Sequence, residues 1–172
     1  PRTLAELALR VTTTAEGPSL PQPVTLTSEV MATRGTAGER YRATLAKADQ
    51  RLLEVRADYP AGAARLAGTW NLDVRSADLA PFTLGRPLPT FHVAGNGTLE
   101  AQTTLAGVHV AGQLTGAISR LDAWMPALAA VEEVGFETAF HVIQQGPALA
   151  VERFEASLHG TQPVLRVKAL QP

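Results

Sequence analysis

The chain has 172 residues, of which 45% are hydrophobic, 18% are charged and 5% are aromatic, and its formal net charge is −1. This length and composition predict a single globular domain with a substantial core, and they exclude a disordered or low-complexity chain. The basic residues are scattered singly, which argues against nucleic-acid binding, and the absence of cysteine excludes disulfides, thiolate metal sites and cysteine nucleophiles.

No stretch of the sequence approaches the roughly 18 continuous apolar residues of a membrane-spanning helix, and no basic-then-apolar signal segment stands at the start. The chain begins at Pro1 without a methionine. We therefore expect residues 1–172 to be one β-rich domain cut from a longer, repetitive protein.

Short runs in which apolar and polar residues alternate return about every dozen residues, separated by Gly, Pro, Asp and Asn. Such alternation places the apolar residues of a strand on one face. The runs predict strands over residues 4–14, 24–33, 39–48, 51–59, 64–76, 90–105, 108–118, 136–145, 148–159 and 164–170. Because most connections are of hairpin length, the sequence predicts a mostly β fold: an antiparallel meander of about nine or ten strands in a curved, trough-like or partly closed sheet.

Two places interrupt the alternation. Between Asp78 and Pro89 several prolines predict an irregular crossing segment, an interrupted sheet and a weak internal division of the domain at 78–89, with Asp78 as a turn-initiating or capping residue. Within the run over 90–105, Gly95-Asn96-Gly97 predicts a bulge, a sharp bend or a turn.

One segment, about 121–134, has helical spacing. Its apolar residues recur at intervals of three and four, Gly135 is placed as a C-terminal cap, and Ser119 with Asp122 resembles a capping box. Pro126 favours an alternative in which a short turn precedes a helix that begins at this proline. The helix would present Trp124, Met125, Leu128 and Val131, either as a plug that completes a closed core or as a lid beside an open apolar trough.

The sequence carries no catalytic signature. The four histidines fall on four different predicted strands, no Gly-x-Ser-x-Gly elbow occurs, and the adjacent Glu132 and Glu133 would point about 100° apart on a helix. We therefore expect a protein that is not an enzyme, with no catalytic residues, no metal site and no cofactor.

The segment 64–118 resembles the AsmA-like envelope proteins, a family that includes the TamB and YhdP types of Gram-negative bacteria. The similarity lies in a strand of the form G-x-W-x-L-x-V that runs into A-D-L-x-x-F at 68–82, in V-x-G-x-G-x-L-x-A at 93–101, and in G-x-L-x-G at 112–116. The resemblance implies a protein anchored in the inner membrane through other parts of its chain, extended through the periplasm as a curled sheet, and carrying phospholipids toward the outer membrane.

On this interpretation one apolar face shelters lipid acyl chains in a hydrophobic groove. Its predicted lining residues are Leu66, Trp70, Leu72, Val74, Phe91, Val93, Leu99, Val108, Val110 and Leu114. Two alternatives remain open at this point. One is a structural or protein-interaction module in which the same face is packed as a closed core, and the other is an enzyme or small-molecule carrier with a closed pocket.

Overall fold

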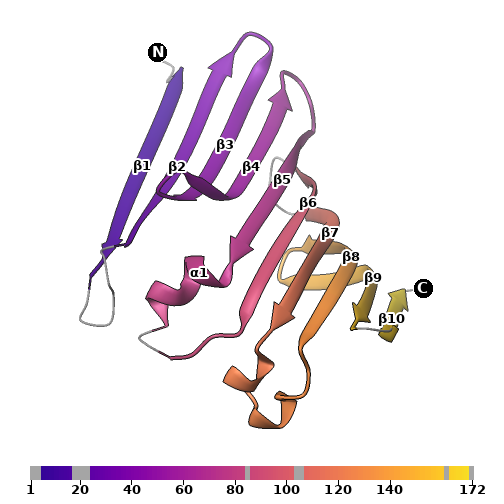
Figure 1. Ribbon diagram of the computed structural model, residues 1–172. Helices are drawn as coiled ribbons and strands as arrows, with labels where there is room; N and C mark the ends of the chain where they lie inside the picture. The colour runs from indigo at the N-terminus through magenta and orange to yellow at the C-terminus, as the bar shows by residue number, and fades with distance from the viewer. Residues whose placement is uncertain (1–4, 17–23, 84–85, 103–106, 161–162, 171–172) are drawn as a thin grey trace.

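The computed structural model of the protein describes residues 5–16, 24–83, 86–102, 107–160 and 163–170. Ten strands form one antiparallel sheet, and their order in the sheet is their order in the sequence. The strands are β1 (Glu6–Ala15), β2 (Val24–Gly35), β3 (Gly38–Lys47), β4 (Gln50–Pro60), β5 (Arg65–Arg75), β6 (Thr90–Gln102), β7 (Gly107–Ser119), β8 (Glu133–Gln145), β9 (Ala148–His159) and β10 (Pro163–Leu170). The sheet is twisted and unclosed, with β1 and β10 at its two edges (Figure 1). The predicted meander is confirmed, while residue 4 and residues 103–105 of the predicted strands lie outside the described residues.

Short turns hold neighbouring strands in register. The β2–β3, β3–β4 and β8–β9 hairpins each have two residues between the strands, and Gly146 in the last of them has φ +57°, a left-handed conformation that glycine adopts without strain. The pairing shifts between Leu45 and Ala46 of β3 and between His141 and Val142 of β8. Elsewhere from β1 to β9 the register is continuous, so the two faces stay distinct across the sheet.

The sheet is not interrupted at 78–89, and that expectation was wrong. β5 and β6 are neighbours paired from Arg65 opposite Gln102 to Arg75 opposite His92. The connection between them leaves the sheet through the short helix α1 (Ser76–Leu79) and the 3-10 turn η1 (Ala80–Phe82) and then returns to the adjacent position. The predicted capping role of Asp78 is confirmed, because its carboxylate accepts a hydrogen bond from the backbone N–H of Arg75 at 2.8 Å.

The helix expected over 121–134 does not form. The segment contains two separate 3-10 turns, η2 (Leu121–Ala123) and η3 (Pro126–Leu128), and Glu133 already belongs to β8. Met125 has the extended backbone that a residue before proline favours, with φ −139° and ψ 104°, so no helix can run through Pro126. The helix that would begin at Pro126 also ends after one turn. The segment lies beyond the ends of β7 and β8 (Figure 1).

The described residues make a single layer with a small core. Among the described residues the buried apolar side chains are few, namely Leu52, Ala57, Pro89, Ala101 and Ile143. Large apolar side chains are exposed toward both edges of the sheet, including Leu9 in β1 at 56% and Leu165 in β10 at 51%. A face that the sequence makes apolar therefore remains accessible to solvent.

Candidate functional site

One face of the sheet is apolar from edge to edge. The cross-strand partners of Trp70 can be followed in both directions through the register, because residues directly opposite each other project to the same face. This central row consists of Leu9, Val30, Ala43, Val55, Trp70, Gly97, Gly112, Phe140, Phe154 and Ala169, one residue from each strand. We call the face that carries this row the apolar face and the opposite one the polar face.

All ten predicted lining residues lie on the apolar face. Leu66, Trp70, Leu72 and Val74 come from β5, and each of them is opposite an apolar residue or glycine of β6. Phe91, Val93 and Leu99 come from β6, whereas Val108, Val110 and Leu114 come from β7. All ten side chains are half-buried. The register thus brings the whole predicted set together, and lipid binding by that set stays a prediction.

Trp70 lies across its neighbours in the central row. Its indole N–H donates a hydrogen bond to the carbonyl oxygen of Ala111 at 3.2 Å, which draws the ring from β5 over β6 to β7. A Cβ atom on Gly97 would lie 2.6 Å from the indole nitrogen, and one on Gly112 would lie 2.3 Å from the ring carbon Cζ2. The glycines therefore provide the space that the indole fills.

The expected bulge or turn at Gly95-Asn96-Gly97 is absent. Gly95 and Gly97 both stay in continuous register with β5 on one side and β7 on the other. A Cβ atom on Gly95 would lie 2.4 Å from the side chain of Leu114, so this glycine too is covered by a neighbouring side chain. The sequence singles out both Trp70 and these glycines, but their contact follows only from the register, which places Gly97 directly opposite Trp70.

Nothing among the described residues forms a second layer over the apolar face. The predicted lid or plug consists of the two 3-10 turns beyond β7 and β8, where the side chains of Trp124 and Met125 are 63% and 55% exposed. Leu128 and Val131 are half-buried in the same connection. Trp124 and Met125 are too exposed to plug a core, so the single element expected to close the apolar face does not do so.

Charged groups on the apolar face are confined to the ends of strands. At one end Glu39 of β3 accepts hydrogen bonds from Tyr41 and from Arg34 of β2. The hydrogen bond from Tyr41, followed by the one from Arg34, lowers the pKa of the Glu39 carboxyl. The bond between Tyr41 and Glu39 also raises the pKa of Tyr41. At the other end Lys47 pairs with the buried carboxylate of Asp78 at 3.3 Å. Glu39 and Lys47 are eight residues apart along β3, which corresponds to about 26 Å of strand.

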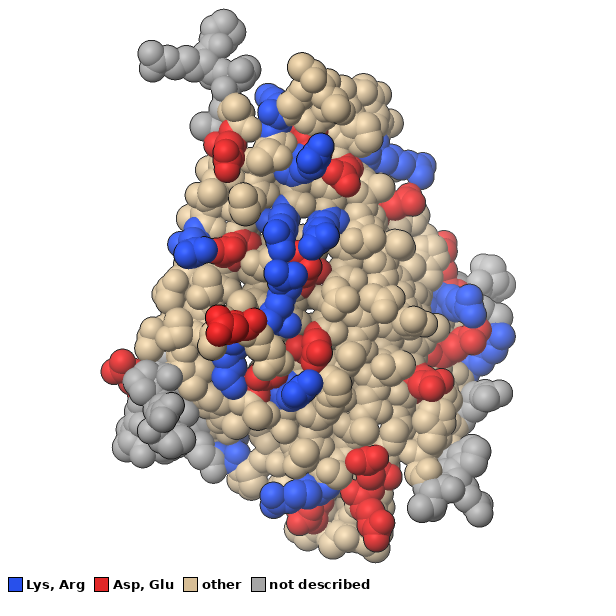
Figure 2. Space-filling view, turned by 45° about the horizontal axis from the view of Figure 1, so that its top comes forward, with Lys and Arg blue, Asp and Glu red and all other residues tan. Residues whose placement is uncertain are grey.

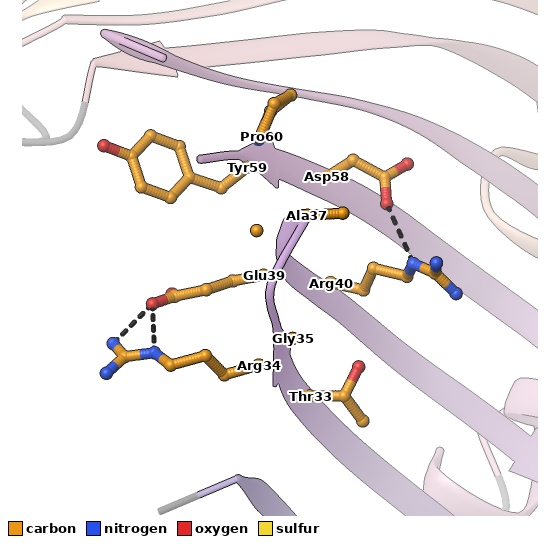
Figure 3. A pocket seen from close by; sticks show the side chains of 10 residues that line it. Thr33, Arg34, Gly35, Ala37, Glu39, Arg40, Asp58, Tyr59 and Pro60 are labelled. Carbon is orange, nitrogen blue, oxygen red and sulfur yellow. Dashed lines mark hydrogen bonds and ion pairs between the residues drawn. The ribbon is translucent and has the colours of Figure 1, made fainter. Parts of the chain in front are cut away.

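A cavity of about 450 Å³ lies at the β2–β3 turn, at the first of these ends. Arg34, Glu39 and Tyr59 project to one side of the hairpin, whereas Arg40 and Asp58 project to the other (Figure 3). Its charges are matched within the cavity, since Arg34 pairs with Glu39 and Arg40 pairs with Asp58 at 3.9 Å. This cavity therefore has no excess charge with which to attract an ion. It lies where the apolar face ends in charged residues.

The polar face carries the other charged residues of the sheet, many of which gather over β3 and β4 (Figure 2). Glu54 is at the centre of this group and pairs with Arg42, Arg51 and Arg56 at 2.7, 2.8 and 2.9 Å. Burial opposes the ionisation of Glu54, but the hydrogen bond from Arg56 and the charges of the arginines outweigh it and lower its pKa.

The histidines do not form a metal site within the described part of the chain, where no group of three potential metal ligands occurs. His109 and His141 lie on the polar face, with ring centroids 5.9 Å apart. His141 pairs with Glu152 at 2.9 Å and His92 pairs with Asp73 at 2.9 Å. Each of these contacts links neighbouring strands on the solvent side.

Comparison of the chain with protein-family models, with curated proteins and with solved structures found no match. Among the described helices, none has the length and apolar character needed to cross a membrane.

Proposed function

We propose that this chain is a segment of an AsmA-like cell-envelope protein, and that its apolar face shelters the acyl chains of phospholipids as they move between the inner and outer membranes. The observation that carries the proposal is the central row, which crosses ten strands without a charged residue and without a covering layer in the described residues. The parent protein would lie in the periplasm and reach the inner membrane through parts of its chain outside residues 1–172.

The dimensions of the apolar face fit this role. Ten strands spaced about 4.8 Å apart extend about 43 Å across the sheet, and about 26 Å separates the charged ends along β3. The hydrocarbon of one membrane leaflet is about 15 Å deep, half of a bilayer core. The acyl chains of one phospholipid therefore fit between the charged margins, with room to move from strand to strand along the central row.

The energetics also favour an acyl chain over water at this face. Each methylene removed from water contributes about 0.8 kcal/mol, so ten sheltered methylenes contribute about 8 kcal/mol before the cost of immobilising the chain. Covering half-buried side chains such as Leu99 and Val110 adds to this sum. The alternative of a closed core depended on a helix over 121–134, and the chain does not form that helix.

The proposal is tested by lipid content and lipid uptake. Organic extraction of the purified chain followed by mass spectrometry is expected to release phospholipid, and a fluorescent phospholipid is expected to bind the delipidated chain. Two adjacent residues of β6 provide a matched pair of variants: Leu99→Lys puts a charge in the middle of the apolar face, and Thr98→Lys puts the same charge on the polar face.

We expect Leu99→Lys to weaken uptake by about tenfold or more, because a lysine beneath an acyl chain loses its hydration. Thr98→Lys is expected to bind lipid as the unmodified chain does, and circular dichroism checks that both variants are folded. A chain that is free of lipid on extraction and takes up none would contradict the proposal. Equal weakening by both variants would place the lipid elsewhere than on the apolar face.

A further inference from the structure

A groove on the polar face lies over β2, β3 and β4 and has a volume of about 460 Å³. All three strands are inner strands of the sheet, so the groove does not depend on what pairs with either edge. Its charged lining residues are Arg40, Arg42, Arg56 and Asp58. Lys and Arg side chains gather on this part of the polar face (Figure 2). The groove therefore carries more positive than negative charge.

The register sets two of these arginines against each other. Arg42 of β3 is directly opposite Arg56 of β4. Side chains at such positions begin at Cβ atoms about 4.5–5.5 Å apart, so like charges there repel. Neither flanking strand supplies a countercharge at this level, because Met31 of β2 is opposite Arg42 and Thr69 of β5 is opposite Arg56. Relief of the repulsion therefore depends on charges at other positions.

The carboxylates near the opposed arginines are too few to neutralise them. Glu54 divides its two oxygens among three guanidinium groups. Asp58 is paired with Arg40 at 3.9 Å, and Glu29 of β2 is paired with Arg10. Each guanidinium has more N–H donors than a shared carboxylate can accept from. The opposed arginines therefore retain donors for an anion from outside, and their planar forks match the oxygens of a phosphate.

A groove of about 590 Å³ on the polar face of β7–β10 differs in charge. Its charged lining residues are Glu137, Glu155 and Lys168, and Lys168 pairs with Glu155 at 3.2 Å. Carboxylates thus outnumber cations among the residues that line it. An anion is disfavoured there and favoured in the groove over β2–β4.

A second groove, of about 470 Å³, adjoins the first on the polar face of β4–β6 and shares Arg56 with it. Its side chains include two cross-strand pairs of uncharged polar residues. Asn71 is opposite Asn96, and Thr69 is opposite Thr98. Amides and hydroxyls both donate and accept hydrogen bonds, so they complement the hydroxyl groups of a sugar. An anion-binding groove therefore continues into one that suits a polyhydroxylated group.

We propose that the two grooves together bind a phosphorylated sugar. Its phosphate lies between Arg42 and Arg56, where a dianion removes their mutual repulsion and accepts charge-assisted hydrogen bonds from both. Its hydroxyl groups bond to Asn71, Asn96 and the neighbouring threonines. This site is on the face opposite the proposed lipid site and goes beyond the proposed function, so either one can fail without the other.

Calorimetric titration of the purified chain with glucose 1-phosphate, inorganic phosphate and glucose, at constant ionic strength, tests the proposal. Glucose 1-phosphate is expected to bind saturably and more tightly than inorganic phosphate, because it occupies both grooves. Glucose alone is expected to show no binding, since it lacks the charge that the arginines select. Absence of saturable binding by glucose 1-phosphate would overturn the proposal.

Variants of the arginine groove are expected to shift the affinity in opposite directions. Arg56→Gln is expected to weaken binding of glucose 1-phosphate roughly tenfold, the effect of losing one charge-assisted hydrogen bond. Arg42→Gln is expected to do the same. Glu54→Gln is expected to tighten binding, because it removes the carboxylate that competes for the same guanidinium groups. Arg153→Gln is the matched control, since Arg153 of β9 is 56% exposed and Arg56 is 60% exposed.

The control is expected to bind as the unmodified chain does, and circular dichroism checks that each variant is folded. Equal weakening by Arg56→Gln and Arg153→Gln would mean that the anion responds only to overall charge and would overturn the site. Asn96→Ala is expected to lower the affinity for glucose 1-phosphate toward that for inorganic phosphate, which itself stays unchanged. An unchanged affinity for glucose 1-phosphate in Asn96→Ala would overturn the assignment of the sugar to the second groove.

Discussion

The indole ring of Trp70 in β5 stacks on the phenyl ring of Phe140 in β8, although two strands lie between them. The ring centroids are 5.9 Å apart with an interplanar angle of 22°, whereas backbones three strands apart in a sheet are separated by about 14 Å. The two side chains meet because the intervening positions of the row are Gly97 and Gly112. The contact ties four strands together on the apolar face.

Gly112→Ala is expected to destabilise the protein by about 1–3 kcal/mol, because the new methyl group would overlap the indole of Trp70 and the carbonyl oxygen of Asn96. Gly35→Ala is the control, since a Cβ atom there meets nothing within 4 Å. Urea unfolding measures both free energies. Equal stability of the two variants would mean that Trp70 does not occupy the space above the glycines.

The two tryptophans are expected to differ sharply in their contribution to stability. Trp70→Ala removes the hydrogen bond to Ala111 and the stack on Phe140, and we expect a loss of about 2 kcal/mol or more in the free energy of unfolding. Trp124→Ala removes a side chain that is 63% exposed, and a change within about 0.5 kcal/mol is expected. A large loss from Trp124→Ala would show that this residue packs against the sheet after all.

The ion pairs of Glu54 predict how stability depends on pH. A carboxyl whose pKa is lowered by folding stabilises the folded state above its ordinary pKa of 4.5, and this contribution is lost as the pH falls through the folded-state value. We therefore expect Glu54→Gln to be less stable than the unmodified chain at pH 6, and the difference to shrink by pH 3. Urea unfolding at the two pH values measures this. A difference that does not change with pH would mean that the arginines do not act through the charge of Glu54.

The connection between β7 and β8 is expected to be dispensable for lipid uptake. Ser119 and Glu133 are directly opposite each other at the ends of these strands, so a short Asn-Gly turn can replace residues 121–131. We expect the shortened chain to fold and to bind fluorescent phospholipid with the affinity of the full one. Loss of uptake in a folded, shortened chain would show that Trp124 and Met125 contribute to the lipid site.

The strands and their faces were predictable because alternation is a local property. Leu66, Trp70, Leu72 and Val74 alternate within one run, and antiparallel pairing through short turns then aligns their face with that of β6 and β7. The absence of a helix over 121–134 was harder to predict, since the apolar residues of this segment have helical spacing. The extended conformation that Pro126 imposes on Met125 outweighs this spacing.

The remaining features depend on residues that only the register brings together. Lys47 and Gln50 meet Asp78 across about thirty residues of sequence, and no local pattern marks their contact. The row of Trp70, Gly97, Gly112 and Phe140 is likewise invisible until the pairing of four strands is known. The useful signal in the sequence was a large aromatic residue on one strand and glycines of the same face on the next two.

A sheet whose strand order equals its sequence order has a nearly one-dimensional network of contacts. Each inner strand pairs with the strand before it and the strand after it, and the stack of Trp70 on Phe140 is a contact that reaches further. Such a chain can assemble strand by strand in the order of synthesis, without closing a long loop first. It can also fray from either edge while its middle stays folded, as repeat proteins do.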